Sequence, residues 1–335
     1  MKAVVLAAGL GRRLGPLTRS IAKPMMPVAN RPVMESIIRR LSEQGFHEIF
    51  SNLYHYSDGI RAYFGDGSKW DVSITWRIEH QLTGPAGGVA AFDDLLSNEE
   101  DILVISGDAL HDIDLRELVS FHQQRNALLS VVMKQVPHLG RYGVGVVDSH
   151  DRIIKFIEKP SIDSPLVGLV SCGIYCVSQS LLARIPRGVL YDFGTDLIPE
   201  LAARGEAVFG FETQSYWKDI GTLAEFRLAN LDAIAGNVHM NLPGEKRSDG
   251  IFVEPGCRIA TDVKMVPPIL IGNNTIIENG IHLVGPLVIG PCAVVGKNSY
   301  ISHSVILQGT RVLPGTFLVE GLIGSLEEQS SEEVK

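Results

Sequence analysis

The sequence lacks a long apolar run and has little positive charge, and each absence narrows the possible functions. No segment approaches the roughly 20 apolar residues that span a bilayer, so no membrane helix is predicted. The 30 Lys and Arg residues are outnumbered by 38 Asp and Glu residues, which gives a net charge of −8. Nucleic-acid-binding proteins usually carry a basic face, so nucleic acid is not an expected partner. A small anionic substrate is still compatible with this balance, because a local basic cluster can oppose the overall charge.

Cysteine is also scarce. The four cysteines, Cys172, Cys176, Cys257 and Cys292, show no CxxC spacing of the kind found in metal and redox motifs. We therefore expect reduced thiols in a cytoplasmic protein and no metal bound by cysteine. The N-terminus has a short apolar run, but glycine and arginine follow too early for a signal peptide, and a strand with a turn is predicted instead.

Up to about residue 235, strand-like and helix-like segments alternate. The β-rich runs lie at residues 2–9, 47–54, 72–79, 101–108 and 127–134, and the helical runs lie at residues 33–45, 84–96 and 114–126. This alternation predicts an α/β domain at residues 1–235, with a mostly parallel sheet and flanking helices. Ligands bind beyond the carboxyl ends of such strands, where Gly107 and Asp108 close one predicted strand.

From about residue 251 the helical pattern stops and a period of six begins. An aliphatic residue recurs at Val253, Ile259, Met265, Ile271, Ile277, Leu283, Ile289, Val295, Ile301, Leu307, Leu313 and Val319. This repeat predicts a parallel β-helix at residues 251–322, and it resembles the left-handed β-helix of hexapeptide-repeat proteins. With three hexads to a coil, it would form four coils. The acidic residues 323–335 are predicted to be a disordered tail.

The most informative segment is VLAAGLGRRLGPLTRSIAKP at residues 5–24, where a strand runs into a glycine-rich turn followed by several cations. Glycine-rich turns after strands often hold phosphate. The segment does not fit a Walker A loop, because Pro16 stands where that motif requires lysine. It does not fit the dinucleotide-binding fingerprint either, because Leu14 stands at the third glycine.

The segment does resemble the signature of the sugar-nucleotide pyrophosphorylases, a family of nucleotidyltransferases. The matching residues are Leu6-Ala7-Ala8-Gly9, Gly11, Arg13-Leu14, Pro16-Leu17-Thr18 and Lys23-Pro24. Further matches follow in the family's order, at Gly84-Pro85-Ala86-Gly87, Gly107-Asp108, Tyr142-Gly143-Val144, Phe156-x-Glu158-Lys159-Pro160, Gly173-Ile174-Tyr175 and Trp217-x-Asp219-Ile220-Gly221-Thr222. Arg12 departs from the pattern, since the family usually has threonine there, and its role is not assigned.

The resemblance implies Mg²⁺-dependent attack of a sugar 1-phosphate on the α-phosphate of a nucleoside triphosphate (NTP), with release of pyrophosphate. Both reactants are anions, so catalysis consists mainly of positioning and charge neutralisation. The implied catalytic residues are Arg13, Lys23, Asp108 and Asp219, and the last two would also hold the metal. The implied nucleotide-binding residues are Leu6, Ala7, Ala8, Gly9, Gly11, Arg13, Gln81, Gly84 and Asp108. The implied sugar-phosphate-binding residues are Gly143, Glu158, Lys159, Ser171 and Gly173.

The resemblance is less specific about the substrates. Gly84-Pro85-Ala86-Gly87 is nearest to the Gly-Thr-Ala-Gly of the mannose-1-phosphate guanylyltransferases, which favours GTP; thymidylyl, uridylyl and adenylyl transfer remain alternatives. Ser171 replaces an asparagine expected to contact sugar hydroxyls, which hints at a modified hexose, heptose or cyclitol phosphate. A non-catalytic regulatory subunit is a further alternative, and so is acyl transfer by His282 or His303 of the repeat. The protein is expected to be a homo-oligomer, with the β-helix as a candidate interface.

Overall fold

The computed structural model describes residues 1–19, 21–137, 139–161 and 168–324, and the chain forms two compact units. The first unit consists of Met1–Gly9, Ile37–Gly107 and Ile113–Trp217. The second consists of Leu10–Ser36, Asp108–Asp112 and the chain from Lys218 onward. The segment with the signature cations therefore belongs to the same unit as the six-residue repeat. Of the predicted tail at 323–335, only Ile323 and Gly324 lie within the described residues.

The first unit is built on a nine-stranded sheet in the order β10-β9-β11-β6-β1-β4-β5, in which β8 pairs with β11 and β12 pairs with β8. The strands are β1 (Lys2–Leu6), β4 (Glu48–Leu53), β5 (Ser73–Ile78), β6 (Asp101–Ser106), β8 (Leu129–Lys134), β9 (Gly143–Val147), β10 (Ile153–Glu158), β11 (Leu169–Ser178) and β12 (Val208–Glu212). β1 runs parallel to β4 and β6, whereas β11 runs antiparallel to β6 and β8. The five predicted strand-like runs each contain one of these strands, so the predicted α/β architecture is confirmed.

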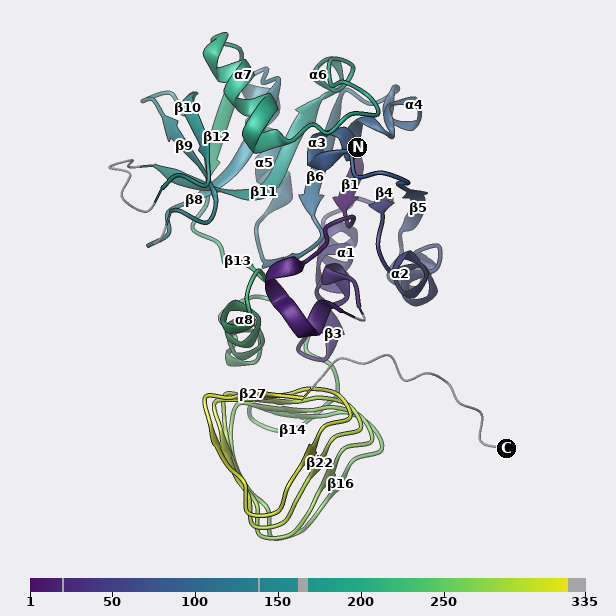
Figure 1. The fold of residues 1–335 in the computed structure, drawn as a ribbon, viewed down its shortest axis with the longest axis vertical. Helices are drawn as coiled ribbons and strands as arrows, with labels where there is room; N and C mark the ends of the chain where they lie inside the picture. Colours follow the sequence, from purple (N-terminus) through teal and green to yellow (C-terminus); the bar gives the residue numbers. More distant parts are fainter. Residues whose placement is uncertain (20, 138, 162–167, 325–335) are drawn as a thin grey trace. The chain divides into compact units, whose positions relative to one another are not determined.

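Helices flank this sheet (Figure 1). The α-helices of the described residues are α1 (Val33–Glu43), α2 (Ser57–Phe64), α3 (Gly84–Ala90), α4 (Asp93–Leu96), α5 (Leu115–Gln124), α6 (Gln179–Leu182), α7 (Ile198–Ala203) and α8 (Leu223–Ala235). The predicted helix at 84–96 is two short helices, because Phe92 leaves the helical conformation between α3 and α4. Asp114 caps α5 by accepting hydrogen bonds from the backbone N–H groups of Arg116 and Glu117.

The central strands are covered on both faces, which explains their continuous apolar runs. Val4 of β1 and Val104 of β6 are fully buried, together with the aromatic ring of Phe92. Parallel strands with both faces covered typically have such sequences, in contrast to the alternating pattern of half-exposed strands.

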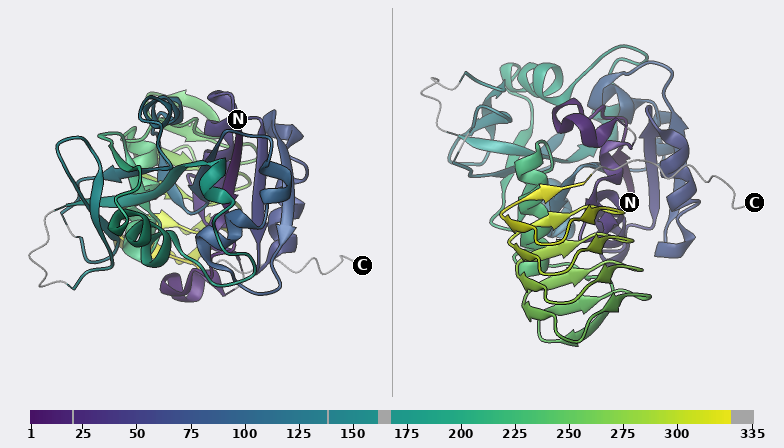
Figure 2. Two further views of the ribbon diagram at one scale, coloured as in Figure 1. Left: turned by 90° about the horizontal axis from the view of Figure 1, so that it is seen from above. Right: turned by 60° about the horizontal axis from the view of Figure 1, so that its bottom comes forward.

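The second unit contains a parallel β-helix with three sheets (Figure 2). The first sheet contains β15 (Ile251–Val253), β18 (Ile269–Ile271), β21 (Leu287–Ile289), β24 (Val305–Ile306) and β27 (Leu322–Ile323), and β14 (Glu245–Ser248) runs antiparallel to β15. The second contains β16 (Arg258–Ile259), β19 (Ile276–Ile277), β22 (Val294–Val295) and β25 (Arg311–Val312). The third contains β17 (Lys264–Val266), β20 (His282–Val284), β23 (Tyr300–Ser302) and β26 (Phe317–Val319).

The predicted period of six is correct through Ile301 and wrong after it. Ile269 pairs with Leu287, 18 positions later, but Val288 pairs with Val305, only 17 positions later. The core of the β-helix therefore continues through Ile306 and Val312, with Leu318 partly buried against it. Of the predicted positions, Leu307 is buried but lies outside this core cluster, whereas Leu313 and Val319 are 68% and 48% exposed. Apolar doublets at 306–307, 312–313 and 318–319 make the two registers look alike in the sequence.

The second unit also holds the short elements within and after the signature segment and, except for Trp217, a pair of short strands formed later in the chain. These are η1 (Arg12–Thr18), η2 (Lys23–Met25), a hairpin of β2 (Pro27–Val28) and β3 (Arg31–Pro32), and a pair formed by β7 (Ala109–His111) and β13 (Trp217–Asp219). α8 packs against β2 and against β21 and β24 of the β-helix. It is apolar on more than one face because it is covered from more than one side.

Candidate active site

In the first unit, four of the predicted nucleotide-binding residues lie at the carboxyl end of β1, namely Leu6, Ala7, Ala8 and Gly9. Leu6 is opposite Ser106 of β6, and its carbonyl accepts a hydrogen bond from Gly107 N–H at 2.8 Å. Ala7 and Ala8 are buried, and Ala7 N–H donates to Asn52 Oδ1 at 3.1 Å. A Cβ added to Gly9 would meet no protein atom within 4 Å. Packing therefore does not require glycine at this position, and the residue leaves room for a ligand to approach the backbone.

The predicted base loop is held by polar side chains that the sequence did not single out. Asn52 Nδ2 donates to Glu79 Oε1 at 2.5 Å, and Glu79 Oε2 accepts from Thr83 N–H and Thr83 Oγ1 at 2.9 and 2.8 Å. Asn52 therefore links the backbone after β1 to the loop before α3. Gln81 is exposed in that loop, and Gly84 has a positive φ with Tyr191 so close that a Cβ would not fit.

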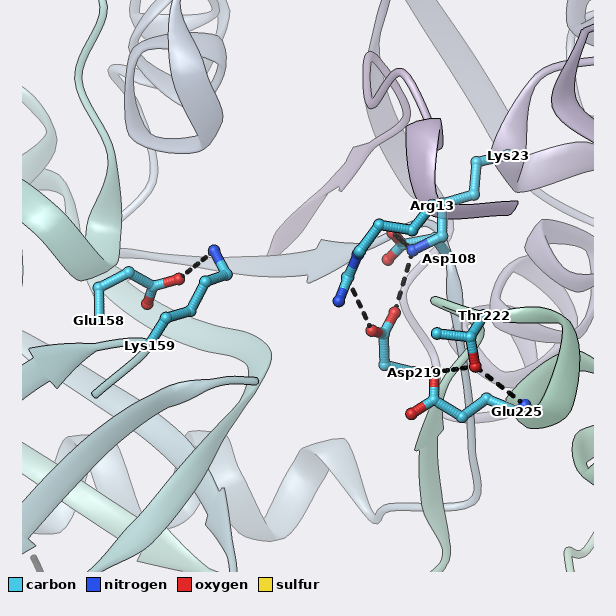
Figure 3. Close-up of polar contacts among 8 residues, drawn as sticks. All are labelled: Arg13, Lys23, Asp108, Glu158, Lys159, Asp219, Thr222 and Glu225. Carbon is cyan, nitrogen blue, oxygen red and sulfur yellow. Dashed lines mark hydrogen bonds and ion pairs between the residues drawn. The ribbon is translucent and has the colours of Figure 1, made fainter. Parts of the chain in front are cut away.

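The predicted sugar-phosphate residues Gly143, Glu158 and Lys159 lie together in the first unit. Glu158 of β10 pairs with Gly143 of β9, and a Cβ on Gly143 or Gly194 would collide with Glu158 Oε2. Two glycines thus make space for one carboxylate. Lys159 Nζ lies 2.5 Å from Glu158 Oε1 (Figure 3), while the Lys159 backbone has a φ of 47°. Left-handed backbone at a lysine is strained and is typical of functional sites.

Ser171 and Gly173 lie in an irregular stretch of β11. The pairing of β11 with β8 shifts between Ser171 and Tyr175, and Gly173 has a φ of 70°. Ser171 Oγ accepts a hydrogen bond from Gly173 N–H at 3.3 Å and lies 3.4 Å from the Tyr175 hydroxyl. The serine hydroxyl therefore stabilises the bulge itself, a contact that the sequence did not suggest.

In the second unit, Lys23 joins the two predicted metal ligands (Figure 3). Its Nζ lies 2.5 Å from Asp108 Oδ2 and 3.0 Å from Asp219 Oδ1, and its side chain is only 8% exposed. Asp108 immediately precedes β7 and Asp219 ends β13, and these two strands pair. The pairing explains why two residues far apart in the sequence converge.

Arg13 completes this cluster, with Nη2 3.4 Å from Asp219 Oδ2. A Cβ on Gly221 would lie 2.6 Å from Asp219 Oδ2 and 3.0 Å from Arg13 Nη2, so glycine is required for this packing. Thr222 then caps α8 by accepting from Glu225 N–H and donating to the Glu225 carboxylate. These two contacts fix the start of the helix that follows Asp219.

The pKa values of Lys23 and Asp219 are both raised above their ordinary values. Burial alone would lower the pKa of Lys23, but the charges of Asp108 and Asp219 outweigh burial and raise that pKa. Burial raises the pKa of Asp219, helped by the negative charge of Asp108, and the cations Lys23 and Arg13 offset only part of this. Lys23 is therefore cationic at neutral pH, and perturbed groups of this kind often mark functional sites.

Gly11 has a φ of 62°, and a Cβ there would press on Lys23 and Thr18 at 3.1 Å. Glycine at this position lets the chain turn tightly over Lys23. The Arg12 side chain, whose role the sequence left open, lies outside what the structure describes.

The donors fit a hard divalent cation such as Mg²⁺. Both carboxylates approach a single ammonium nitrogen, so their oxygens can reach one common point. Within the described residues no three His, Cys, Asp or Glu side chains form a metal-binding group. A cation held here would need further oxygen ligands from substrate phosphates or water, as Mg²⁺ usually does.

Each unit thus brings together its own set of predicted residues. Arg13, Lys23, Asp108 and Asp219 form one cluster, and Gly143, Glu158 and Lys159 form another. Sequence reasoning missed Asn52, Glu79 and Gly194. The first two carry no sequence signal, since their contact joins a residue within β4 to a residue that follows β5.

Comparison with known proteins agrees with these features. The Nucleotidyl transferase family matches residues 2–235. A UTP–glucose-1-phosphate uridylyltransferase of Synechocystis sp. is 32% identical over 96% of this chain and 87% of its own length. A mannose-1-phosphate guanylyltransferase of Mycobacterium tuberculosis is 29% identical over 93% of this chain and 81% of its own.

A solved structure from Bacillus anthracis shares the fold, with a TM-score of 0.63 and 24% identity over 72% of this chain and 97% of its own. No helix among the described residues is both long and apolar enough to cross a membrane. The family matches most of the chain, and the uridylyltransferase of Synechocystis sp. is 32% identical over 96% of it, so the chain belongs to the nucleotidyl transferase family.

Proposed function

We propose that the protein transfers a nucleotidyl group from an NTP to a sugar 1-phosphate, with release of pyrophosphate and with Mg²⁺ as cofactor. The convergence of Lys23 and Arg13 on Asp108 and Asp219 carries this proposal. Mg²⁺ at the two carboxylates would neutralise phosphate charge. The protein's own part is to hold two anionic substrates in line and to spread the charge that develops on the leaving pyrophosphate.

The residues divide this work by their chemistry. The Arg13 guanidinium, half-exposed and already directed at the Asp219 carboxylate, suits two oxygens of a departing pyrophosphate. Lys23 supplies a compact buried charge to the triphosphate. The backbone at Gly9 and Gly11 donates to phosphate oxygens. Lys159 pairs with the phosphate of the sugar, and Glu158 accepts hydrogen bonds from sugar hydroxyls.

GTP is the proposed nucleotide, on the basis of the Gly84-Pro85-Ala86-Gly87 loop. Pro85 has no N–H and stands at the start of α3, so base recognition at this position would not use its backbone. UTP is the second candidate, because the relative with 32% identity is a uridylyltransferase.

For the sugar, we propose a modified hexose, heptose or cyclitol phosphate. Ser171 offers one hydroxyl, already engaged with Gly173 N–H, where an asparagine amide would reach further. We also propose a cytoplasmic homo-oligomer, based on the four free thiols and on the solenoid edges of the β-helix.

The test is a panel that pairs GTP, UTP, dTTP and ATP with several sugar 1-phosphates, read by pyrophosphate release. Asp108→Asn and Asp219→Asn should each lower kcat by at least about 100-fold. Asp71→Asn, which changes a carboxylate that is 91% exposed, is the matched control and should retain full activity. Absence of turnover with every pair in Mg²⁺ would refute the proposed activity. Preference for another NTP would refute the assignment of GTP but not the proposed reaction.

A further inference from the structure

The hairpin that follows Lys23 has a strained turn. Ala29 and Asn30 connect β2 and β3, and their φ angles are 47° and 61°. Two central residues with positive φ form the type I′ turn that suits a two-residue hairpin. Asparagine tolerates this conformation, but alanine does not favour it. Ala29 is also completely buried, so its surroundings must hold it in place.

One buried asparagine of α8 fixes this turn. Asn230 is 1% exposed, and its Oδ1 accepts a hydrogen bond from Ala29 N–H at 3.0 Å. Its Nδ2 donates to Pro27 O at 3.1 Å and to Phe226 O at 3.0 Å. Both donors of the amide are used, and a buried amide so satisfied favours one arrangement of the turn and the helix.

The other side of the turn is attached to the β-helix. Asn30 Nδ2 donates to Ile289 O of β21 at 3.1 Å. Arg31 Nη2 forms an ion pair with Glu254 Oε1 at 2.9 Å, and the second oxygen of this buried carboxylate accepts from Asn273 N–H. A buried carboxylate needs such a partner, which makes Arg31 a specific anchor.

The anchored segments are the ones that carry the catalytic cluster. The hairpin begins four residues after Lys23, and Met26 N–H donates back to Lys23 O at 3.1 Å. α8 begins four residues after Asp219, with Thr222 as its cap. Asn230 therefore ties the Lys23 segment to the Asp219 segment, and the Lys23–Asp219 contact of 3.0 Å depends on how those segments are placed.

We propose that the hexapeptide-repeat domain is a positioning device for the transfer site. Asn30 and Arg31 fasten the hairpin to the β-helix, Asn230 fastens it to α8, and together they hold Lys23 against Asp219. These three are positioning residues, since none of them belongs to the catalytic cluster. The role given to Lys23 and Asp219 rests on the proposed function, whereas the attachment of the hairpin does not.

The test compares variants that remove the attachment but keep the turn. Asn30→Gly retains a residue that adopts positive φ and removes only the hydrogen bond to Ile289 O. Arg31→Ala removes the ion pair, and Arg31→Lys keeps a cation for Glu254. Arg311→Ala, at an exposed arginine of β25, is the control within the same β-helix.

We expect kcat to fall about 10- to 100-fold in the Asn30→Gly/Arg31→Ala double variant, because small displacements of catalytic groups cost rates of that order. The KM for the sugar 1-phosphate should change less than about twofold, and Arg31→Lys should recover part of the lost kcat. Unchanged kcat in the double variant, or a loss equal to that of the Arg311→Ala control, would overturn the positioning role.

A second readout does not depend on activity. Amide hydrogen exchange at residues 21–28 should become faster in the double variant and stay as in the wild type in Arg311→Ala. Faster exchange in a protein without turnover would support the attachment and refute the proposed reaction. Unchanged exchange would refute the attachment even in an active enzyme.

Discussion

The ammonium group of Lys23 lies within hydrogen-bonding distance of Asp108 and Asp219 at once. One buried cation thus neutralises two carboxylates that would otherwise repel each other. The same three groups are the proposed charge centre of the reaction, so changes to Lys23 should affect stability and activity together.

We expect Lys23→Met to lower kcat at least about 100-fold and to destabilise the protein by up to roughly 3–5 kcal/mol, because two partly buried carboxylates lose their cation. Millimolar Mg²⁺ should raise the unfolding temperature of this variant more than that of the wild type, since metal and ammonium compete for the same oxygens. Calorimetry with and without Mg²⁺ measures the loss of stability and the response to Mg²⁺, and steady-state kinetics measures kcat. An equal Mg²⁺ response in the two proteins would argue against the shared site.

Alanine should change different kinetic constants at Gly9 and at Gly221. Gly9→Ala adds a Cβ that meets no protein atom, so the unfolding temperature should stay within about 2 °C of the wild type. The KM for the NTP should nevertheless rise at least about tenfold, because the methyl group would stand between the backbone and a phosphate.

Gly221→Ala should instead lower kcat, because its Cβ would force Asp219 away from Arg13. Steady-state kinetics with each substrate varied, together with thermal unfolding, separates the two variants. A stable and fully active Gly9→Ala enzyme would refute close phosphate contact at that residue.

Local patterns in the sequence predict the elements of this fold well, and long-range contacts explain what they miss. The strand end at Ser106 is readable because Gly107 follows it directly. The end at Leu6 is not, because the apolar run continues through Ala7 and Ala8 to Gly9. The attachment of Ala29 to Asn230 is not readable, because the two residues are 201 positions apart and neither belongs to a pattern. The shortened coil after Ile301 was hidden because either residue of each following doublet fits an apolar position.

A buried histidine should make the stability of the first unit depend on pH. His122 of α5 is buried, with Nδ1 3.0 Å from Ser130 Oγ and Nε2 3.3 Å from Asp101 Oδ1. Burial lowers the pKa of His122, and the charge of Asp101 offsets only part of that effect. The unfolded chain, with a histidine pKa of about 6.5, therefore binds the proton more readily than the folded protein does.

This stabilisation should be complete above pH 6.5 and should fade as the pH falls toward the folded-state pKa of His122. Between pH 7.5 and 5.5, the unfolding temperature of the wild type should fall further than that of His122→Gln. His55→Gln, at an exposed histidine, is the control and should follow the wild type. Parallel pH profiles for the wild type and His122→Gln would exclude this histidine as the cause.

The strained backbone of Lys159 makes it possible to remove the charge of this residue without changing the stability of the protein. Lys159→Gly removes the ammonium group, which is 59% exposed, and relieves a left-handed conformation that costs a lysine about 1 kcal/mol. Glycine also gains freedom in the unfolded chain, so the two effects should leave the free energy of unfolding nearly unchanged. The KM for the sugar 1-phosphate should rise at least about tenfold, because its phosphate loses a counter-charge.

Asp71→Gly is the control for this variant, because it makes the same backbone change at a φ of 58° and should leave the KM for the sugar 1-phosphate unaltered. If both variants kept the wild-type KM, Lys159 would have no part in binding the sugar phosphate, and its strain would need another explanation.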